Sequence, residues 1–132
     1  MRRVRFPRRM SYFSASVIEA AASEREVELT TYGRRTGRAH RTTLWISSDG
    51  RRVFVRSGGG LGRDWPRNLL AQGRGLLQVG ALEVPVTARH VTDPAEARAV
   101  SELVSRKYGV KRPSTDGVPT PAEQATFELL PE

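Results

Sequence analysis

Hydrophobic residues near the start of the chain recur first at every fourth position and then at every second position. Phe13, Val17 and Ala21 share one face of a helix at this spacing, which predicts a helix over residues 11–23. From residue 27 apolar and polar side chains alternate, which is typical of a half-buried strand over residues 27–32. The change of period therefore marks the passage from a helix to a first strand.

The rest of the pattern consists of short segments separated by turn residues. Further strands are predicted at residues 41–47, 51–57, 76–79, 82–91 and 126–130, and helices after residues 64 and 93. Asp49-Gly50 and Gly80-Ala81 join neighbouring strands through tight turns, so these strands should be antiparallel. Because short antiparallel strands of this kind commonly close into a barrel, the sequence predicts an α+β fold with a six-stranded antiparallel barrel and flanking helices.

The length and the residue types limit the chemistry. A chain of 132 residues suits one domain, which we place at residues 11–132, after an arm at residues 1–10. There is no cysteine, which excludes disulfides, thiolate metal ligands and a cysteine nucleophile. His40 and His90 lie far apart in the sequence, so no metal site is expected. No run of about 20 apolar residues exists, so we expect no membrane span and a cytoplasmic location.

Much of the positive charge lies in the arm. The formal net charge is +8. Five basic residues fall in the first ten positions: Arg2, Arg3, Arg5, Arg8 and Arg9. A charged end segment is usually a solvated tail. The alternative is weak, sequence-independent binding of nucleic acid through its phosphates.

A second basic segment lies inside the domain, in a glycine-flanked turn at residues 33–38. Arg34 and Arg35 lie in this turn together with the hydroxyl of Thr36, and Arg41 follows it. Cations this close repel one another unless an anion lies among them, and turn amides add further donors. The turn is therefore either a phosphate site or a solvated loop whose arginines point apart.

Conventional catalytic groups are not visible in the sequence. The glycine-rich loop at residues 57–62 lacks the Gly-Lys-Ser/Thr ending of a phosphate loop, and the hairpins contradict a parallel dinucleotide-binding unit. The carboxylates fall mostly at helix caps and turns, with no pair marked for acid–base work. The catalytic residues therefore stay unknown, and an enzyme with this sequence would depend on a bound cofactor.

Two segments carry a likeness to a known family. One is Thr30-Thr31-Tyr32-Gly33-Arg34-Arg35-Thr36-Gly37-Arg38 followed by Arg41-Thr42-Thr43-Leu44, and the other is Trp65-Pro66-Arg67-Asn68-Leu69-Leu70-Ala71-Gln72. They resemble the deazaflavin-dependent nitroreductase-like proteins of the flavin-binding split-barrel superfamily. Arg56-Ser57-Gly58 resembles the uncharacterised members most. Pro66 departs from the family, which has tyrosine there, and Ala39-His40 replaces a frequent proline–arginine pair.

The resemblance implies a six-stranded split barrel that binds deazaflavin coenzyme F420 or FMN. It assigns Arg34, Arg35 and Thr36 to the cofactor phosphate, with Arg41 in support. It places Ser57, Trp65 and Asn68 beside the cofactor ring or its tail. These seven residues are the predicted cofactor site.

The function implied by the resemblance is an oxidoreductase that transfers hydride to a small organic acceptor. The alternative is a basic, non-catalytic barrel that binds a cofactor-like ligand or nucleic acid. Against nucleic acid, aromatic residues make up only 7% of the chain and are not interleaved with the arginines. The sequence is compatible with either a monomer or a homodimer.

Overall fold

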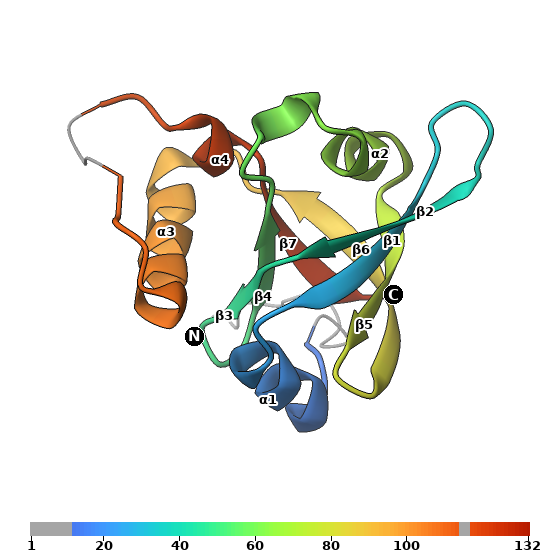
Figure 1. The fold of residues 1–132 in the computed structure, drawn as a ribbon, viewed down its shortest axis with the longest axis horizontal. Coiled ribbons are helices and arrows are strands. Elements are labelled where there is room, and N and C mark those ends of the chain that lie inside the picture. Colours follow the sequence, from blue (N-terminus) through green and yellow to red (C-terminus); the bar gives the residue numbers. More distant parts are fainter. Residues whose placement is uncertain (1–11, 114–116) are drawn as a thin grey trace, which may run out of the picture.

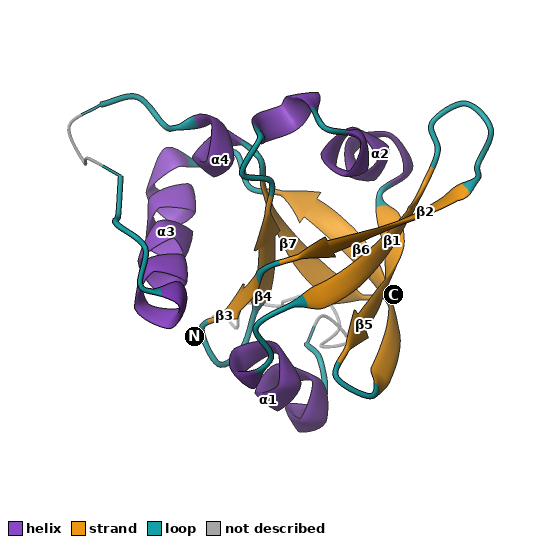
Figure 2. Ribbon diagram, in the orientation of Figure 1, coloured by secondary structure: helices purple, strands orange, loops and turns teal. Residues whose placement is uncertain are grey.

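The computed structural model describes residues 12–113 and 117–132, and the predicted arm at residues 1–10 lies outside the described residues. The described chain forms one antiparallel sheet with helices around it (Figures 1 and 2). The strands are β1 (Val27–Tyr32), β2 (Ala39–Leu44), β3 (Ile46–Ser48), β4 (Val53–Arg56), β5 (Arg74–Val79), β6 (Leu82–His90) and β7 (Thr126–Pro131). The helices are α1 (Ala15–Ser23), α2 (Asp64–Gln72), α3 (Pro94–Tyr108) and α4 (Pro121–Gln124), and a 3₁₀ turn covers Gly60–Gly62.

The predicted α+β class is confirmed, but the prediction of six strands is wrong. The sheet has 7 strands in the order β2-β1-β5-β6-β7-β4-β3. The predicted strand at residues 41–47 is broken at Trp45, so that β2 pairs with β1 while β3 pairs with β4. One continuous stretch of chain therefore lies at both ends of the strand order, and the sheet must curl into a half-barrel to bring those ends together.

The core fills the inside of this curled sheet. Leu29, Leu77 and Phe127 are fully buried there, and α2 adds Leu69 while α1 adds Ala21. In Figure 1, α1 lies below the sheet and α2 above it. Burial of these apolar side chains is the main favourable contribution to folding.

Helix α3 covers the outside of the half-barrel beside β3 and β4. It encloses a second apolar cluster, in which Phe54 of β4 packs with Ala97 and Val100. The helix begins after Asp93, whose carboxylate accepts a hydrogen bond from the Ala95 N–H at 3.4 Å. It ends at Gly109, which has a φ of 74° that a residue with a Cβ rarely adopts. These caps set the two ends of α3.

Within residues 12–113 and 117–132, no helix is both long and apolar enough to cross a membrane.

Candidate cofactor and substrate cleft

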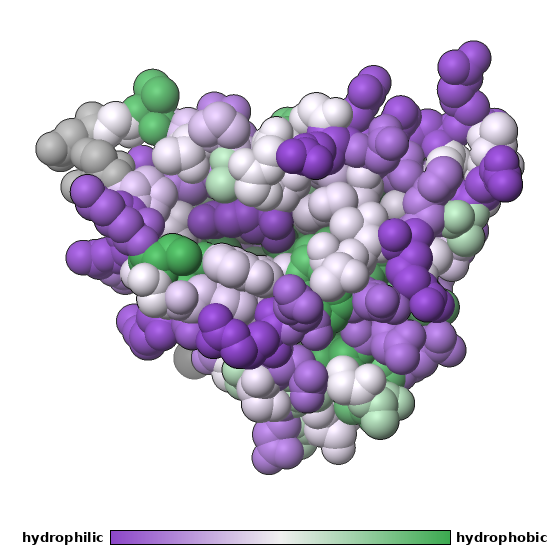
Figure 3. Space-filling view, viewed as in Figure 1, coloured by the Kyte–Doolittle hydropathy of each residue, from purple (hydrophilic) through white to green (hydrophobic). Residues whose placement is uncertain are grey.

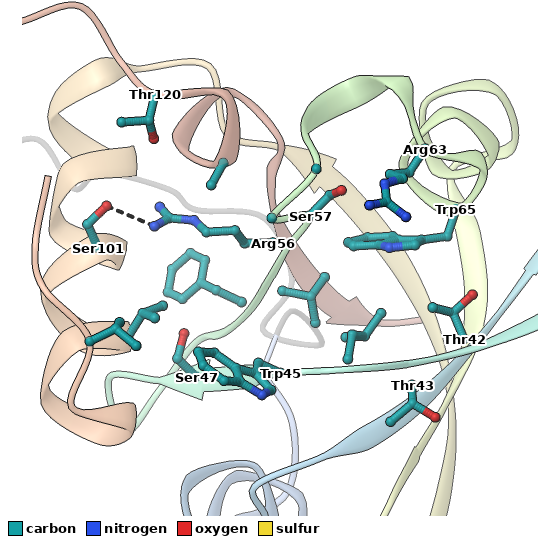
Figure 4. A pocket seen from close by; sticks show the side chains of 18 of the residues that line it. Thr42, Thr43, Trp45, Ser47, Arg56, Ser57, Arg63, Trp65, Ser101 and Thr120 are labelled. Atoms are coloured by element: carbon teal, nitrogen blue, oxygen red, sulfur yellow. Dashed lines mark hydrogen bonds between the residues drawn. The ribbon is translucent and has the colours of Figure 1, made fainter.

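A cleft of about 820 Å³ opens where β2 and β4 part (Figures 3 and 4). β2 ends at Leu44, before Trp45, and pairs with β1, whereas β3 begins at Ile46 and pairs with β4, so the space between β2 and β4 is left open. Its walls come from β2, β3 and β4, from the loop before α2 with the first turn of α2, from α3 with the loop after it, and from the start of α4. The residues that line it are Thr42, Thr43, Leu44, Trp45, Ser47, Phe54, Val55, Arg56, Ser57, Gly58, Gly59, Arg63, Asp64, Trp65, Ser101, Val104, Val110, Lys111, Pro113, Thr120 and Ala122. Ligand pockets commonly have volumes of roughly 300–1,000 Å³, so this cleft could hold a small organic molecule.

The end of α3 fixes the bend that creates the cleft. The ring of Tyr108 stacks on Trp45 with a centroid separation of 4.0 Å, and its hydroxyl accepts a hydrogen bond from the Ile46 N–H at 3.1 Å. The ammonium group of Lys107 donates to the carbonyls of Ala21, Glu24 and Ile46 at 2.9, 2.6 and 2.8 Å. These bonds join α1, α3 and the start of β3, so the parting of β2 from β4 is a firmly held feature.

Arg56, the last residue of β4, lies in the wall of the cleft nearest α3. Its Nε donates to the Thr126 hydroxyl, one terminal nitrogen donates to the Ser101 hydroxyl, and the other donates to the Ala97 carbonyl, each at 2.8 Å. Burial lowers the pKa of Arg56, and the negative charge of Glu123 partly offsets this. A guanidinium remains charged at neutral pH even when burial lowers its pKa in this way, so the cleft has a cation in its wall.

Glu123 of α4 lies behind Arg56 and is 1% exposed. Its carboxylate accepts hydrogen bonds from the Ser101 hydroxyl at 2.8 Å and from the Thr120 N–H at 3.0 Å. Burial alone would raise the pKa of Glu123. The Thr120 and Ser101 hydrogen bonds, together with the charges of Arg98 and Arg56, outweigh burial and leave the pKa below its usual value. Glu123 is therefore an anion that balances part of the positive charge beside the cleft.

Two buried hydroxyl groups face the open space. Ser47 and Ser57 are each 3% exposed and line the cleft. Among the described residues neither hydroxyl has a hydrogen-bond partner, and both oxygens are open to solvent. Buried polar groups are normally paired, so these hydroxyls are available to a ligand or to water.

Flat and apolar side chains form the remaining walls. Trp65 of α2 is 8% exposed and packs at a tilt against Phe127, while Trp45 is 43% exposed. Figure 4 shows Trp65 and Arg63 on one side of the opening and Arg56 and Ser101 on the other. In Figure 3, patches of hydrophobic surface show between hydrophilic side chains across this face. The arrangement suits a flat molecule with polar groups at its edges.

The structure brings part of the predicted cofactor site together. Ser57 and Trp65 both line the cleft. Asn68 lies behind it, 2% exposed, where its side-chain nitrogen donates to the Thr31 hydroxyl at 3.1 Å and its oxygen accepts from Arg34 at 2.9 Å. Arg34 also forms an ion pair with Asp64 at 3.8 Å. Because Asp64 lines the cleft, Arg34 lies at the rim and is already partly paired.

The other predicted phosphate residues do not line the cleft. Arg35 is exposed in the turn, and the hydroxyl of Thr36 accepts a hydrogen bond from the Arg38 N–H at 3.2 Å. Arg41 pairs with Glu28 at 3.3 Å and is 62% exposed. The register pairs Arg41 with Thr30, one residue away from the buried Thr31, so Arg41 points to the opposite face of the sheet from Asn68. The structure therefore does not bring Arg41 together with the rest of the predicted set.

Comparison with known proteins assigns the family. The profile of a family described as uncharacterised proteins conserved in bacteria, DUF2255, matches residues 17–129. The chain belongs to the DUF2255 family. No curated protein matches the sequence.

Solved structures place this DUF2255 protein among known split-barrel folds. An F420-H2 dependent reductase is 20% identical with a TM-score of 0.59, and the match covers 80% of this chain and 94% of that one. A pyridoxamine 5′-phosphate oxidase-like protein from Listeria innocua is 14% identical with a TM-score of 0.65, covering 89% and 91%. A protein described as a domain-swapped dimer is 20% identical with a TM-score of 0.59, covering 82% and 81%. At these identities the likeness shows the fold of the DUF2255 chain alone.

Sequence reasoning missed the residues on the α3 side of the cleft. Arg56 belongs to the Arg56-Ser57-Gly58 motif, but no role follows from that motif, because the partners of Arg56 are at least 41 residues away in the sequence. A local signal did exist for Glu123: Thr120 and Glu123 have the spacing of a capping box, which the structure confirms at the start of α4. The described residues contain no group of three or more His, Asp or Glu side chains suited to a metal ion.

Proposed function

We propose that this DUF2255 protein is an oxidoreductase that binds a flavin-type or deazaflavin cofactor in the cleft between β2 and β4. The observation that carries the proposal is the cleft itself, which lies where the sheet splits and has two tryptophans and two unpaired hydroxyls in its walls. The fold neighbours support the same class, because one is an F420-H2 dependent reductase and another is pyridoxamine 5′-phosphate oxidase-like.

The residues present fit such a cofactor. A ring of this kind needs an apolar slot with a hydrogen-bond donor at its edge, and Leu44, Trp65 and Val55 offer the slot while Ser57 offers the hydroxyl. The bound cofactor would supply hydride chemistry to a small organic acceptor. The chain would hold the ring in a fixed orientation and exclude water from one of its faces.

The phosphate of the cofactor would lie at the rim, beside the turn at residues 33–38. Arg35 is exposed there, and Arg34 is held toward the rim by Asn68 and Asp64. Planar guanidinium groups match phosphate through pairs of hydrogen bonds. Arg41 is left out of this proposal because it lies on the opposite face of the sheet.

The test is a titration of the protein with F420 and with FMN, followed by desalting and absorption spectroscopy. We expect one cofactor to be retained. Arg34→Ala and Arg35→Ala should each weaken affinity by about tenfold to a hundredfold, the range expected for one charge-assisted hydrogen bond. Arg35→Lys should be milder because it keeps the charge but not the fork.

Arg67→Ala is the matched control, since Arg67 is an exposed arginine of α2 that does not line the cleft. It should leave affinity unchanged. Retention of neither cofactor by the wild-type protein would remove the oxidoreductase proposal. Retention that neither Arg34→Ala nor Arg35→Ala affects would move the phosphate to another place.

The domain-swapped dimer among the fold neighbours supports a homodimer as the solution state. Light scattering coupled to size-exclusion chromatography tests this proposal, and a monomer at micromolar concentration would contradict it.

A further inference from the structure

The α3 side of the cleft has features that a cofactor ring does not require. Arg56 has five N–H groups, of which three bond to Thr126, Ser101 and Ala97. Two N–H groups remain, one on each terminal nitrogen, on a side chain that lines the cleft. A pair of guanidinium N–H groups matches the two oxygens of a carboxylate or of a phosphate.

The charges on this side favour a singly charged anion. Arg56 and Arg98 are positive, and Glu123 between them is a buried carboxylate that forms an ion pair with Arg98 at 3.6 Å. Glu123 and Arg98 offset each other, so about one positive charge is left for a ligand. Charged side chains in the cleft lining are otherwise Arg63 and Lys111, which are cationic, and Asp64. Lys111 follows α3 but is exposed to water, so the buried charge that a ligand meets on this side is that of Arg56. A monoanion would balance this charge, whereas a phosphate dianion would exceed it.

The walls beside Arg56 fit the body of such a ligand. Phe54 and Ser47 are paired in register on neighbouring strands and lie on the same face as Arg56. Val104 of α3 and Trp45 complete the apolar side. The free hydroxyl of Ser47 gives a further donor next to the guanidinium.

We propose that the α3 side of the cleft is the subsite for the acceptor, and that the acceptor is an organic carboxylate with a flat apolar body. The carboxylate binds the two remaining N–H groups of Arg56, and the body lies against Phe54 and Trp45. The assignment to an acceptor rests on the proposed function. The carboxylate site itself does not depend on a cofactor.

The two tryptophans give a direct readout, because Trp45 and Trp65 are the only ones in the chain and both line the cleft. Tryptophan fluorescence is followed while the protein without cofactor is titrated with benzoate, benzamide and phenyl phosphate. We expect benzoate to bind at least about tenfold more tightly than benzamide, since only benzoate makes charge-assisted bonds to Arg56. Equal binding of benzoate and benzamide, or tighter binding of phenyl phosphate, would overturn the proposal.

Variants connect the effect to Arg56. Arg56→Gln should abolish the preference for benzoate over benzamide, and Arg56→Lys should keep part of it. Thr126→Val removes one partner of Arg56 but leaves the cation in place, so this control should keep the preference. Should Arg56→Gln fail to fold, Ser47→Ala decides, because it should weaken benzoate severalfold more than benzamide. An unaltered preference in folded Arg56→Gln, or in Ser47→Ala where Arg56→Gln does not fold, would contradict the site.

A final titration separates the subsite from the cofactor site. With F420 or FMN bound, benzoate affinity should change by less than about threefold, because the two ligands occupy different sides of the cleft. Competition between benzoate and the cofactor would show that Arg56 binds the cofactor and would refute an acceptor subsite. If neither cofactor binds, the proposed function fails, while the difference between benzoate and benzamide still decides whether the carboxylate site exists.

Discussion

The turn at residues 33–38 and the α3 side of the cleft both contain basic residues, but they hold them in different ways. In the turn, Arg35 is exposed, and Arg34 has one hydrogen bond to Asn68 of 2.9 Å and a longer contact with Asp64. On the α3 side, Arg56 and Lys107 each donate three hydrogen bonds at 2.6–2.9 Å to partners on several elements.

The difference shows that a cluster of basic residues in the sequence does not by itself indicate which cations the folded protein holds through hydrogen bonds. Exposed arginines in a turn lose little when the chain unfolds, because water solvates them in both states. A half-buried cation has exchanged water for protein acceptors, so removing it leaves those acceptors unpaired. We therefore expect the two regions to respond differently to substitution.

Arg56→Met should have the largest effect on stability. The substitution keeps much of the side-chain volume but removes the donors to Thr126, Ser101 and Ala97 and leaves Glu123 with less compensation. We expect a loss of about 2–4 kcal/mol in the free energy of unfolding, measured by urea denaturation. Arg35→Ala in the turn is the comparison and should stay within about 0.5 kcal/mol. Similar losses for both variants would erase the distinction between the regions.

Lys107→Met should have the second-largest effect on stability. Its ammonium group bonds to three carbonyls at the end of α1 and at the start of β3, and the variant would leave them without this donor. The expected loss is about 2–3 kcal/mol by the same denaturation experiment. The other lysine of the chain, Lys111, is exposed at the cleft, so Lys111→Met should cost less than about 0.5 kcal/mol. An equal loss of stability in Lys111→Met and Lys107→Met would contradict the role of Lys107 in holding the bend between β2 and β3.

Glu123 should make stability depend on acid pH. Its pKa in the folded protein lies below the usual value of 4.5, because its hydrogen bonds and the nearby cations outweigh burial. A lowered pKa contributes stability above about pH 4.5, and this contribution is lost as the pH falls through the folded pKa. Melting temperatures from about pH 7 to about pH 3 should therefore fall less steeply for Glu123→Gln than for the wild-type protein. Parallel curves of melting temperature against pH for the two proteins would show that Glu123 is not the anion that balances Arg56 and Arg98.

Arg34→Ala should give the smallest effect that can still be measured. The variant removes the hydrogen bond to the buried oxygen of Asn68, which we expect to cost about 1 kcal/mol. Its neighbour Arg35→Ala should cost less than about 0.5 kcal/mol. The order of the two variants in urea denaturation tests whether the turn is anchored through Arg34. A larger loss of stability in Arg35→Ala than in Arg34→Ala would contradict this anchoring role of Arg34.

Alternation of apolar residues predicts most of the sheet, but it does not show where the barrel splits. Leu44-Trp45-Ile46 is a continuous apolar run, so one strand was predicted across the point where β2 ends and β3 begins. The break depends on Tyr108 and Lys107, which are more than 60 residues further along the chain. No pattern in the sequence near residue 45 therefore predicts the break between β2 and β3.

The candidate site likewise contains residues that belong to local sequence motifs and residues whose partners are distant in the sequence. The resemblance names Ser57 and Trp65 as neighbours of a cofactor, and both line the cleft, while their contact with a cofactor stays a prediction. Arg41 follows the turn in sequence, yet the alternation of β2 sends it to the other face. Arg56 lies among apolar residues of β4, and its environment arises only when α3 and β7 pack beside it.

Two glycines allow a direct test of our proposal that the cleft between β2 and β4 holds the cofactor. A Cβ added at Gly58 or at Gly62 would meet no atom within 4 Å, and neither residue has a positive φ. Gly58 lines the cleft and Gly62 does not. Gly58→Leu and Gly62→Leu should therefore cost similar, small amounts of stability.

The decisive measurement is the affinity of wild type, Gly58→Leu and Gly62→Leu for F420 and FMN, with melting temperatures recorded for each protein. We expect Gly58→Leu to bind the retained cofactor at least about tenfold more weakly than wild type, and Gly62→Leu to bind it as tightly as wild type. Unchanged binding by Gly58→Leu, at a melting temperature equal to that of Gly62→Leu, would contradict the cleft as the cofactor site.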